Sequence, residues 1–198
     1  MPPGPKWAPR PRYADAVPTI DRCPECPYQG KAIGPRGDPE SRLILVGEAP
    51  GQNEVAEEQP FVRRPSRAGG VLWDALDEVG LSEDGIFITN AVACQPHPVK
   101  PKVASINACR PRLVHDIERA PRAVVMTLGA TAFRAVTEER GFLMRDIRGR
   151  QVDTTWGPLI PTIHPASVLH QPREGPMLVQ MLVEHLRRAR RLAFGTGE

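Results

Sequence analysis

The chain has 198 residues, enough for one domain with a sizeable hydrophobic core. Its net charge of +3 is compatible with nucleic-acid binding without requiring it, and its 23 prolines and 17 glycines indicate long irregular connections. No apolar run approaches the roughly 20 residues that span a bilayer, and the N-terminus has no apolar segment typical of a secretory signal. We therefore expect a cytoplasmic protein with no membrane partner.

Residues 1–20 are rich in proline and arginine and are expected to form an extended arm ahead of a single domain, residues 21–198. Short apolar runs predict strands at about 42–47, 86–92, 123–129 and 159–163. Apolar residues with helical spacing predict helices at about 69–81, 104–119, 130–136 and 175–193. Strands that alternate with helices predict an α/β three-layer sandwich with a central, mostly parallel, four-stranded sheet.

Unusual residues follow the predicted strands. Gly47 and Glu48 follow the first strand, Asn90 ends the second, Gly129 ends the third, and His164 follows the last. The carboxyl ends of parallel strands lie along one edge of a sheet, and ligands bind in the crevice there. We therefore expect these residues to meet at one cleft. A carboxylate at a strand end does not suit phosphate binding, because phosphates favour positive potential.

The four cysteines are candidates for a single metal site. They are Cys23, Cys26, Cys94 and Cys109. A disulfide framework is not expected in an intracellular chain of this length. Four thiolates gathered from distant segments could hold zinc or an iron–sulfur cluster, whereas the alternative is a set of unlinked buried cysteines. Zinc or a cluster would then have a structural role, because it would link the N-terminal arm to the loop after the second strand.

The chain resembles the family-4 uracil-DNA glycosylases, the iron–sulfur members of the uracil-DNA glycosylase superfamily. The resemblance rests on the order of "GEAPGQNE", "PFV", "ITNAVAC", "LGA" and "PTIHPAS" together with the four cysteines, and covers about Cys23 to Pro172. It implies a uracil-DNA glycosylase-like fold and a [4Fe–4S] cluster on the four cysteines. It also implies a base excision repair enzyme that flips uracil out of DNA and hydrolyses its N-glycosidic bond.

The resemblance gives several residues a role in catalysis. His164 would donate a hydrogen bond to the departing uracil, and such preorganised stabilisation contributes on the order of 3 kcal/mol. Asn90 would distinguish uracil from cytosine, because its amide can accept from N3–H and donate to O4. Phe61 would stack on the flipped base. Glu48, with Glu54 as a second candidate, would position water and favour the cationic sugar.

These residues also have structural interpretations. Glu48 could cap the helix that begins near residue 53, Glu54 could be a solvated helix residue, and Phe61 could be an ordinary core residue. Gly47 and Ala49, on either side of Glu48, complete the expected base site.

The segment "PFVRRPSRAGG" departs from the family pattern, because it is about four residues longer and carries Arg63, Arg64 and Arg67. Such a loop could grip the DNA backbone, admit a bulkier base, close the pocket, or be only a solvated charged loop. We expect these arginines, with Ser167, to contact single- or double-stranded DNA, and the protein to be a monomer. Two alternatives stay open: an enzyme for a modified or hypermodified pyrimidine, and a catalytically silent DNA- or base-binding module.

Overall fold

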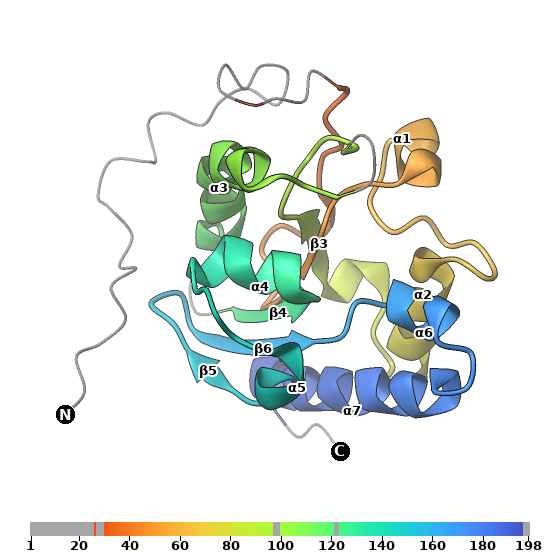
Figure 1. Ribbon diagram of the computed structural model, residues 1–198. Coiled ribbons are helices and arrows are strands. Elements are labelled where there is room, and N and C mark those ends of the chain that lie inside the picture. Colours follow the sequence, from red (N-terminus) through yellow and green to blue (C-terminus); the bar gives the residue numbers. More distant parts are fainter. Residues whose placement is uncertain (1–25, 27–29, 97–99, 121–122, 196–198) are drawn as a thin grey trace.

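In the described part of the chain, six strands form one sheet in the order β1-β3-β2-β4-β6-β5 (Figure 1). The computed structural model describes residue 26 and residues 30–96, 100–120 and 123–195, so the predicted N-terminal arm and Cys23 lie outside the described residues. The strands are β1 (Arg36–Gly37), β2 (Leu43–Gly47), β3 (Phe87–Asn90), β4 (Val124–Leu128), β5 (Val152–Asp153) and β6 (Pro158–Thr162).

The centre of the sheet is parallel. Strands β3, β2, β4 and β6 pair in parallel, and they correspond to the four predicted strands. β1 and β5 add one short antiparallel strand at each edge. The prediction of a mostly parallel sheet is confirmed, but the sheet has six strands rather than four. The two edge strands have two residues each, too few to show any alternation of apolar and polar side chains.

Helices cover both faces of the sheet, as the three-layer prediction requires. They are α1 (Gln52–Glu57), α2 (Ala68–Glu78), α3 (Val103–Glu118), α4 (Ala130–Thr137), α5 (Met144–Ile147), α6 (Ala166–His170) and α7 (Gly175–Phe194), with a 3₁₀ turn at Glu83–Gly85. One hydrophobic cluster joins Leu43 and Leu45 of β2 to α2 and α7, and a second joins Ile44 and Val46 to α3 and α4. The two clusters lie on opposite faces of the sheet because successive side chains of a strand point to opposite faces.

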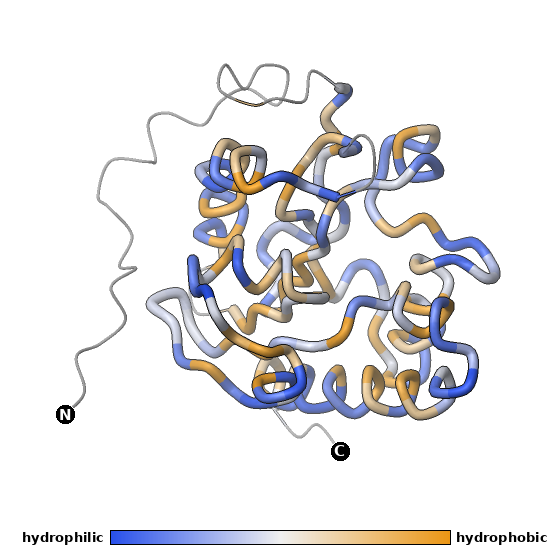
Figure 2. Tube along the Cα trace, in the orientation of Figure 1, coloured by the Kyte–Doolittle hydropathy of each residue, from blue (hydrophilic) through white to orange (hydrophobic). Residues whose placement is uncertain are grey.

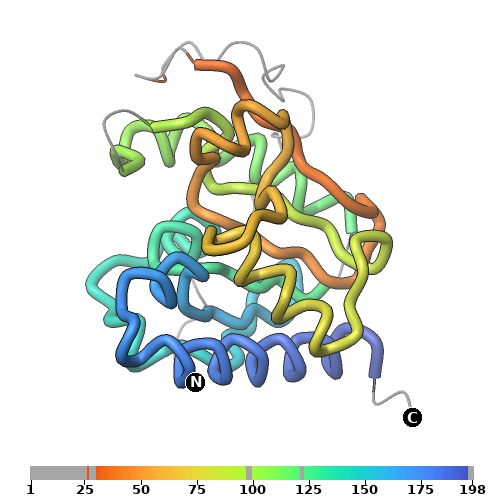
Figure 3. The backbone as a smooth tube through the Cα atoms, turned by 90° about the vertical axis from the view of Figure 1, so that its right-hand side faces the viewer, coloured from red at the N-terminus to blue at the C-terminus, as the bar shows by residue number. Residues whose placement is uncertain are grey.

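The hydropathy of the chain reflects this layering. Apolar segments run through the central strands, whereas apolar and polar residues alternate around the outer helices (Figure 2). α7 lies along the outside of one layer, where it packs on α2, as the turned view also shows (Figure 3). No helix in the described ranges is both long and apolar enough to cross a membrane.

Two glycines let the loop after α1 pack closely on the first turn of α2. A Cβ on Gly69 would lie 2.0 Å from the Val62 carbonyl oxygen, and one on Gly70 would lie 2.2 Å from that of Arg64. The Trp73 indole also donates a 2.7 Å hydrogen bond to the Phe61 carbonyl. These contacts fix the backbone that carries the Phe61 ring.

We expect Gly69→Ala to destabilise the protein. Alanine improves helix propensity by up to about 1 kcal/mol, but overpacking against the backbone costs about 1–3 kcal/mol, so the clash decides the sign. The measurement is the free energy of unfolding in denaturant. Gly34→Ala is the control, because a Cβ there meets nothing within 4 Å. An unfolding free energy for Gly69→Ala equal to that of the wild type would contradict this account.

Candidate active site

A cavity of about 170 Å³ opens at the carboxyl edge of the parallel strands. It is lined by Ala49, Gly51, Glu54, Phe61, Ala68, Asn90 and His164. Ala49 lies just after β2, Asn90 ends β3 and His164 lies just after β6, so strand ends far apart in the sequence meet as the sequence predicted. Glu48 and Gly47 were also predicted to lie here, but neither lines the cavity.

Two of the side chains that line the cavity pack directly against the backbone of Gly47. It is paired with Asn90 in the parallel register of β2 and β3. A Cβ on Gly47 would lie 2.3 Å from the Asn90 Oδ1 and 2.5 Å from the Phe61 Cε2. Because glycine has no side chain, both the Asn90 amide and the Phe61 ring fit here.

The Asn90 side chain has a buried oxygen without a hydrogen-bond partner in the described part of the chain. The residue is only 5% exposed, and its Oδ1 has no hydrogen-bond partner among the described residues. An unsatisfied buried acceptor costs about 1–3 kcal/mol, so such atoms in native proteins call for an explanation. A ligand with an N–H group would satisfy the Asn90 Oδ1.

Phe61 belongs to the hydrophobic core and also forms an aromatic wall of the cavity. Its backbone has a φ of 50°, a left-handed conformation uncommon for a bulky residue. The ring is buried, and its centroid lies 6.0 Å from that of the His164 ring, with 35° between the planes. The two rings thus lie near each other on one cavity.

His164 presents a hydrogen-bond donor. The Ala166 N–H donates to the His164 Nδ1 at 3.2 Å, so a neutral imidazole carries its proton on Nε2. Burial lowers the pKa of His164 below its ordinary value of 6.5; the Glu48 carboxylate opposes this shift and His170 adds to it. Gly129 lies beside the imidazole with a φ of +93°, and a Cβ there would come within 3.1 Å of the His164 Cβ.

The two candidate carboxylates have different partners. The half-buried Glu48 accepts a 2.6 Å hydrogen bond from the Thr131 hydroxyl in the first turn of α4. Glu54 accepts from the Gly51 N–H at 3.1 Å, so this residue, rather than Glu48, caps α1. Thr131 was not predicted from the sequence, although its place just after β4 and Gly129 puts it at the same edge of the sheet.

The arginine-rich loop lies outside the cavity. Arg63 pairs with Asp77, and its Nη2 lies 3.6 Å from an Asp74 oxygen. The Arg64 Nε donates to Glu57 at 2.9 Å. Both arginines are exposed and are turned toward carboxylates of α2 and α1, so neither narrows the cavity.

Two other residues predicted to contact DNA lie near this edge of the sheet. The exposed Arg67 is the N-cap residue of α2. The half-buried Ser167 donates its backbone N–H to the His164 carbonyl at 2.8 Å.

Three of the four cysteines lie within the described residues, and all three are buried. They are Cys26, Cys94 and Cys109. The Cys94 thiol donates to the Gly30 carbonyl at 3.2 Å, and Cys94 forms an isolated antiparallel bridge with Ala32. The segment after Cys26 therefore lies against the loop after β3. Across the described ranges, no three His, Cys, Asp or Glu side chains are grouped so that they could hold a metal ion.

Comparison with known proteins places the chain in a family. Residues 35–187 match the family model of the uracil DNA glycosylase superfamily. A type-4 uracil-DNA glycosylase of Sulfurisphaera tokodaii is 30% identical over 192 residues, which cover 92% of this chain and 84% of that protein. A second one, of Saccharolobus solfataricus, is 32% identical over 168 residues, or 80% of this chain and 76% of that protein. The chain belongs to the uracil-DNA glycosylase superfamily, which confirms the predicted resemblance.

We expect the His164 imidazole to titrate below its ordinary value of 6.5, because burial disfavours the imidazolium. Glu48→Gln should lower the pKa of His164 further, since it removes the carboxylate that favours the charged form. Imidazole resonances followed by NMR against pH measure both values, with His164→Gln used for assignment. A midpoint above 6.5 in the wild type would show that burial does not dominate, and a higher midpoint in Glu48→Gln than in the wild type would show that the carboxylate does not favour the imidazolium.

Proposed function

We propose that this protein is a monofunctional uracil-DNA glycosylase of base excision repair, which hydrolyses the N-glycosidic bond between uracil and deoxyribose in DNA. The observation that carries the proposal is the cavity in which Asn90, Phe61 and His164 meet. It offers a buried unpaired acceptor, an aromatic wall and a neutral donor. The type-4 uracil-DNA glycosylases that resemble the chain over most of its length support the same function.

Asn90 accounts for the choice of base. A flipped uracil presents N3–H to the Asn90 Oδ1 and O4 to the amide nitrogen. Cytosine has no proton on N3, so its entry would leave the buried Oδ1 unsatisfied, at a cost of about 1–3 kcal/mol. Phe61 provides a stacking surface, which is worth about 1–3 kcal/mol per base.

His164 and Glu48 account for bond cleavage. As the C1′–N1 bond breaks, its electron pair moves onto the uracil ring, and the His164 Nε2–H donates to the O2 on which charge develops. Burial keeps the imidazole neutral, so it donates a hydrogen bond without transferring the proton. One Glu48 oxygen accepts from Thr131, and the other oxygen orients the water that adds to C1′ and accepts the proton that this water loses. Solvent water later protonates the released uracil anion, and Glu48 returns its proton to solvent. The negative carboxylate also stabilises the positive charge on the sugar.

The proposed enzyme is a hydrolase without lyase activity. A lyase needs an amine that forms a Schiff base with the sugar, and no lysine is among the described residues that line the cavity. We propose that Glu54 supports the cavity wall and that Arg63, Arg64, Arg67 and Ser167 contact the DNA strands outside it. Arg63 and Arg64 would exchange their carboxylate partners for phosphates.

We also propose a [4Fe–4S] cluster held by Cys23, Cys26, Cys94 and Cys109. Four thiolates are a suitable ligand set for such a cluster, and the three described thiols are buried. The main-chain bridge of Ala32 with Cys94 and the bond from the Ile33 N–H to the Ala93 carbonyl hold the segment after Cys26 beside the loop after β3. When bound, the cluster would serve as a structural link between these segments. The monomeric state and the cytoplasmic location stay predictions.

The direct test is base release from oligonucleotides that carry one uracil, one bulky modified pyrimidine or one normal thymine. We expect alkali-sensitive strand breaks at uracil alone. Asn90→Ala and His164→Ala should each lower the turnover rate about tenfold or more, because each removes a preorganised contact to the base. The affinity for DNA should stay nearly unchanged. Asn107→Ala is the matched control, since Asn107 is exposed on α3 and does not line this cavity.

The other outcomes point to the two alternatives. Release of the modified base alone would favour an enzyme for modified pyrimidines, and DNA binding without any breaks would favour a silent binding module. Wild-type turnover in both Asn90→Ala and His164→Ala would remove these residues from the active site.

The cluster is tested by metal analysis of protein purified without oxygen. We expect a brown protein that contains iron, and we expect Cys109→Ser to lose both iron and thermal stability, because metal binding is coupled to folding. Cys23→Ser should behave in the same way if both cysteines hold one cluster. A colourless wild-type protein loaded with zinc would contradict this assignment.

A further inference from the structure

A buried ionic network lies next to Asn90, outside the cavity. Arg112 and Asp116 of α3 form an ion pair one helical turn apart, and they are only 7% and 5% exposed. The Arg112 Nη1 donates to the Thr89 hydroxyl at 2.9 Å, and this hydroxyl donates to the Asp116 Oδ2 at 2.8 Å. The Arg112 Nη2 donates to the carbonyl oxygen of Asn90 itself. Nothing in the proposed chemistry uses this network.

The sheet explains why the Asn90 carbonyl accepts from a side chain. On one side, β3 pairs with β2 as far as Asn90, and the Ala91 N–H donates to the Gly47 carbonyl. On its other side, β1 pairs only with Phe87 and Ile88. The segment ahead of β1 pairs again only at Ala93 and Cys94, so no described strand pairs with Asn90 on this side of β3. The guanidinium of Arg112 takes the place of a neighbouring strand.

Stability alone is a weak reason for such a network. Removing two charges from water is costly, and apolar side chains of similar volume often serve stability equally well. In this network the Arg112 Nε has no hydrogen-bond partner among the described residues, so the burial of the guanidinium is not fully compensated. A planar guanidinium does provide fixed geometry, because its donors point in set directions.

We propose that Arg112 is a positioning residue for base recognition, which holds the backbone of Asn90 so that the amide faces the cavity. This inference rests on the proposed uracil excision. Asn90 lies at the end of its strand, where the ladder on the β1 side no longer constrains it. Arg112 joins Asn90 to Thr89 and to α3, and Asp116 fixes the guanidinium. A misplacement of about 1 Å in a reactive complex can cost on the order of a hundredfold in rate.

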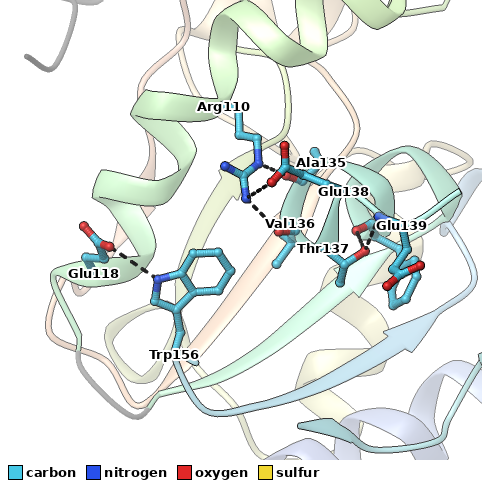
Figure 4. Close-up of polar contacts among 9 residues, drawn as sticks. Arg110, Glu118, Ala135, Val136, Thr137, Glu138, Glu139 and Trp156 are labelled. Atoms are coloured by element: carbon cyan, nitrogen blue, oxygen red, sulfur yellow. Dashed lines mark hydrogen bonds and ion pairs between the residues drawn. The ribbon is translucent and has the colours of Figure 1, made fainter. Parts of the chain in front are cut away.

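Arg110 provides a matched control. It lies on the same helix, and its guanidinium also donates to main-chain carbonyls, namely those of Ala135 at 3.2 Å and Val136 at 3.4 Å, while it pairs with Glu138 (Figure 4). These partners belong to the end of α4 and its C-cap, and none of them lines the base cavity. Arg110→Met thus removes the same type of contact from α3 without touching Asn90.

The test compares the wild type, Arg110→Met and the double variant Arg112→Met/Asp116→Asn, which removes both buried charges together and leaves no ion unpaired. The readouts are inhibition by free uracil, the selectivity for uracil over cytosine, and the melting temperature. We expect the double variant to bind free uracil about tenfold more weakly or worse and to lose selectivity, because the amide is no longer held. Arg110→Met should stay within about twofold of the wild type, since distant sites act independently. Rates are expressed per iron-loaded protein, because Cys109 lies on the same helix.

The proposal would be overturned if free uracil inhibited the folded double variant as strongly as the wild type. It would also be overturned if Arg110→Met weakened uracil inhibition as much as the double variant does. If the double variant does not fold, Arg112→Lys replaces it: lysine keeps a charge beside Asp116 but cannot bridge Thr89 and Asn90 with a planar fork. We expect the same weakening of uracil binding, and wild-type binding would overturn the proposal.

A wild type that releases no uracil would instead reject the proposed function. The side-chain amide resonance of Asn90 then tests positioning without any substrate. It should shift or broaden in the Arg112 variants and not in Arg110→Met.

Discussion

The cavity depends on the absence of a side chain at Gly47. The parallel register of β2 and β3 pairs this residue with Asn90, and the chain brings Phe61 to the same place from a loop beyond α1. Any Cβ at Gly47 would lie within 2.5 Å of both side chains. The Asn90 amide and the Phe61 ring can therefore lie side by side in the cavity wall only because β2 ends in a glycine. The left-handed backbone of Phe61 and the bond from Trp73 complete this arrangement.

Burial and charge act in opposite directions on His164, and burial prevails. Desolvation lowers the pKa of the imidazole, whereas the nearby Glu48 carboxylate raises it. A site that placed the carboxylate in direct contact with the ring would favour an imidazolium, which binds an anionic product tightly but also repels a cationic sugar. Here Thr131 holds one Glu48 oxygen. In the proposed mechanism the Glu48 charge thus stabilises the cationic sugar, and the neutral His164 ring donates a hydrogen bond to the uracil.

The sequence could predict those parts of the structure that depend on long apolar runs. Each central strand lies within about two residues of its predicted range, because strands buried on both faces, such as β2, are apolar throughout. Asn90 and His164 were found because strand ends converge on one edge. The pairing of Arg63 and Arg64 with α2 and α1, and the burial of Arg112 and Asp116, could not be read from the sequence. Charged residues on a helix have the same pattern whether a distant partner or water satisfies them.

Asn90 lies at a gap in the pairing of the sheet, between the ladder of β1 with β3 and the contacts of Ala32 and Ile33 with Cys94 and Ala93. A continuous ladder would fix the Asn90 backbone through a neighbouring strand. β1 begins at Arg36, opposite Ile88, and does not reach Asn90, so the carbonyl of Asn90 needs another donor. Arg112 supplies that donor from α3. A buried ion pair on α3 thus takes over the role of a strand neighbour at the one residue of β3 that must hold its side chain in place.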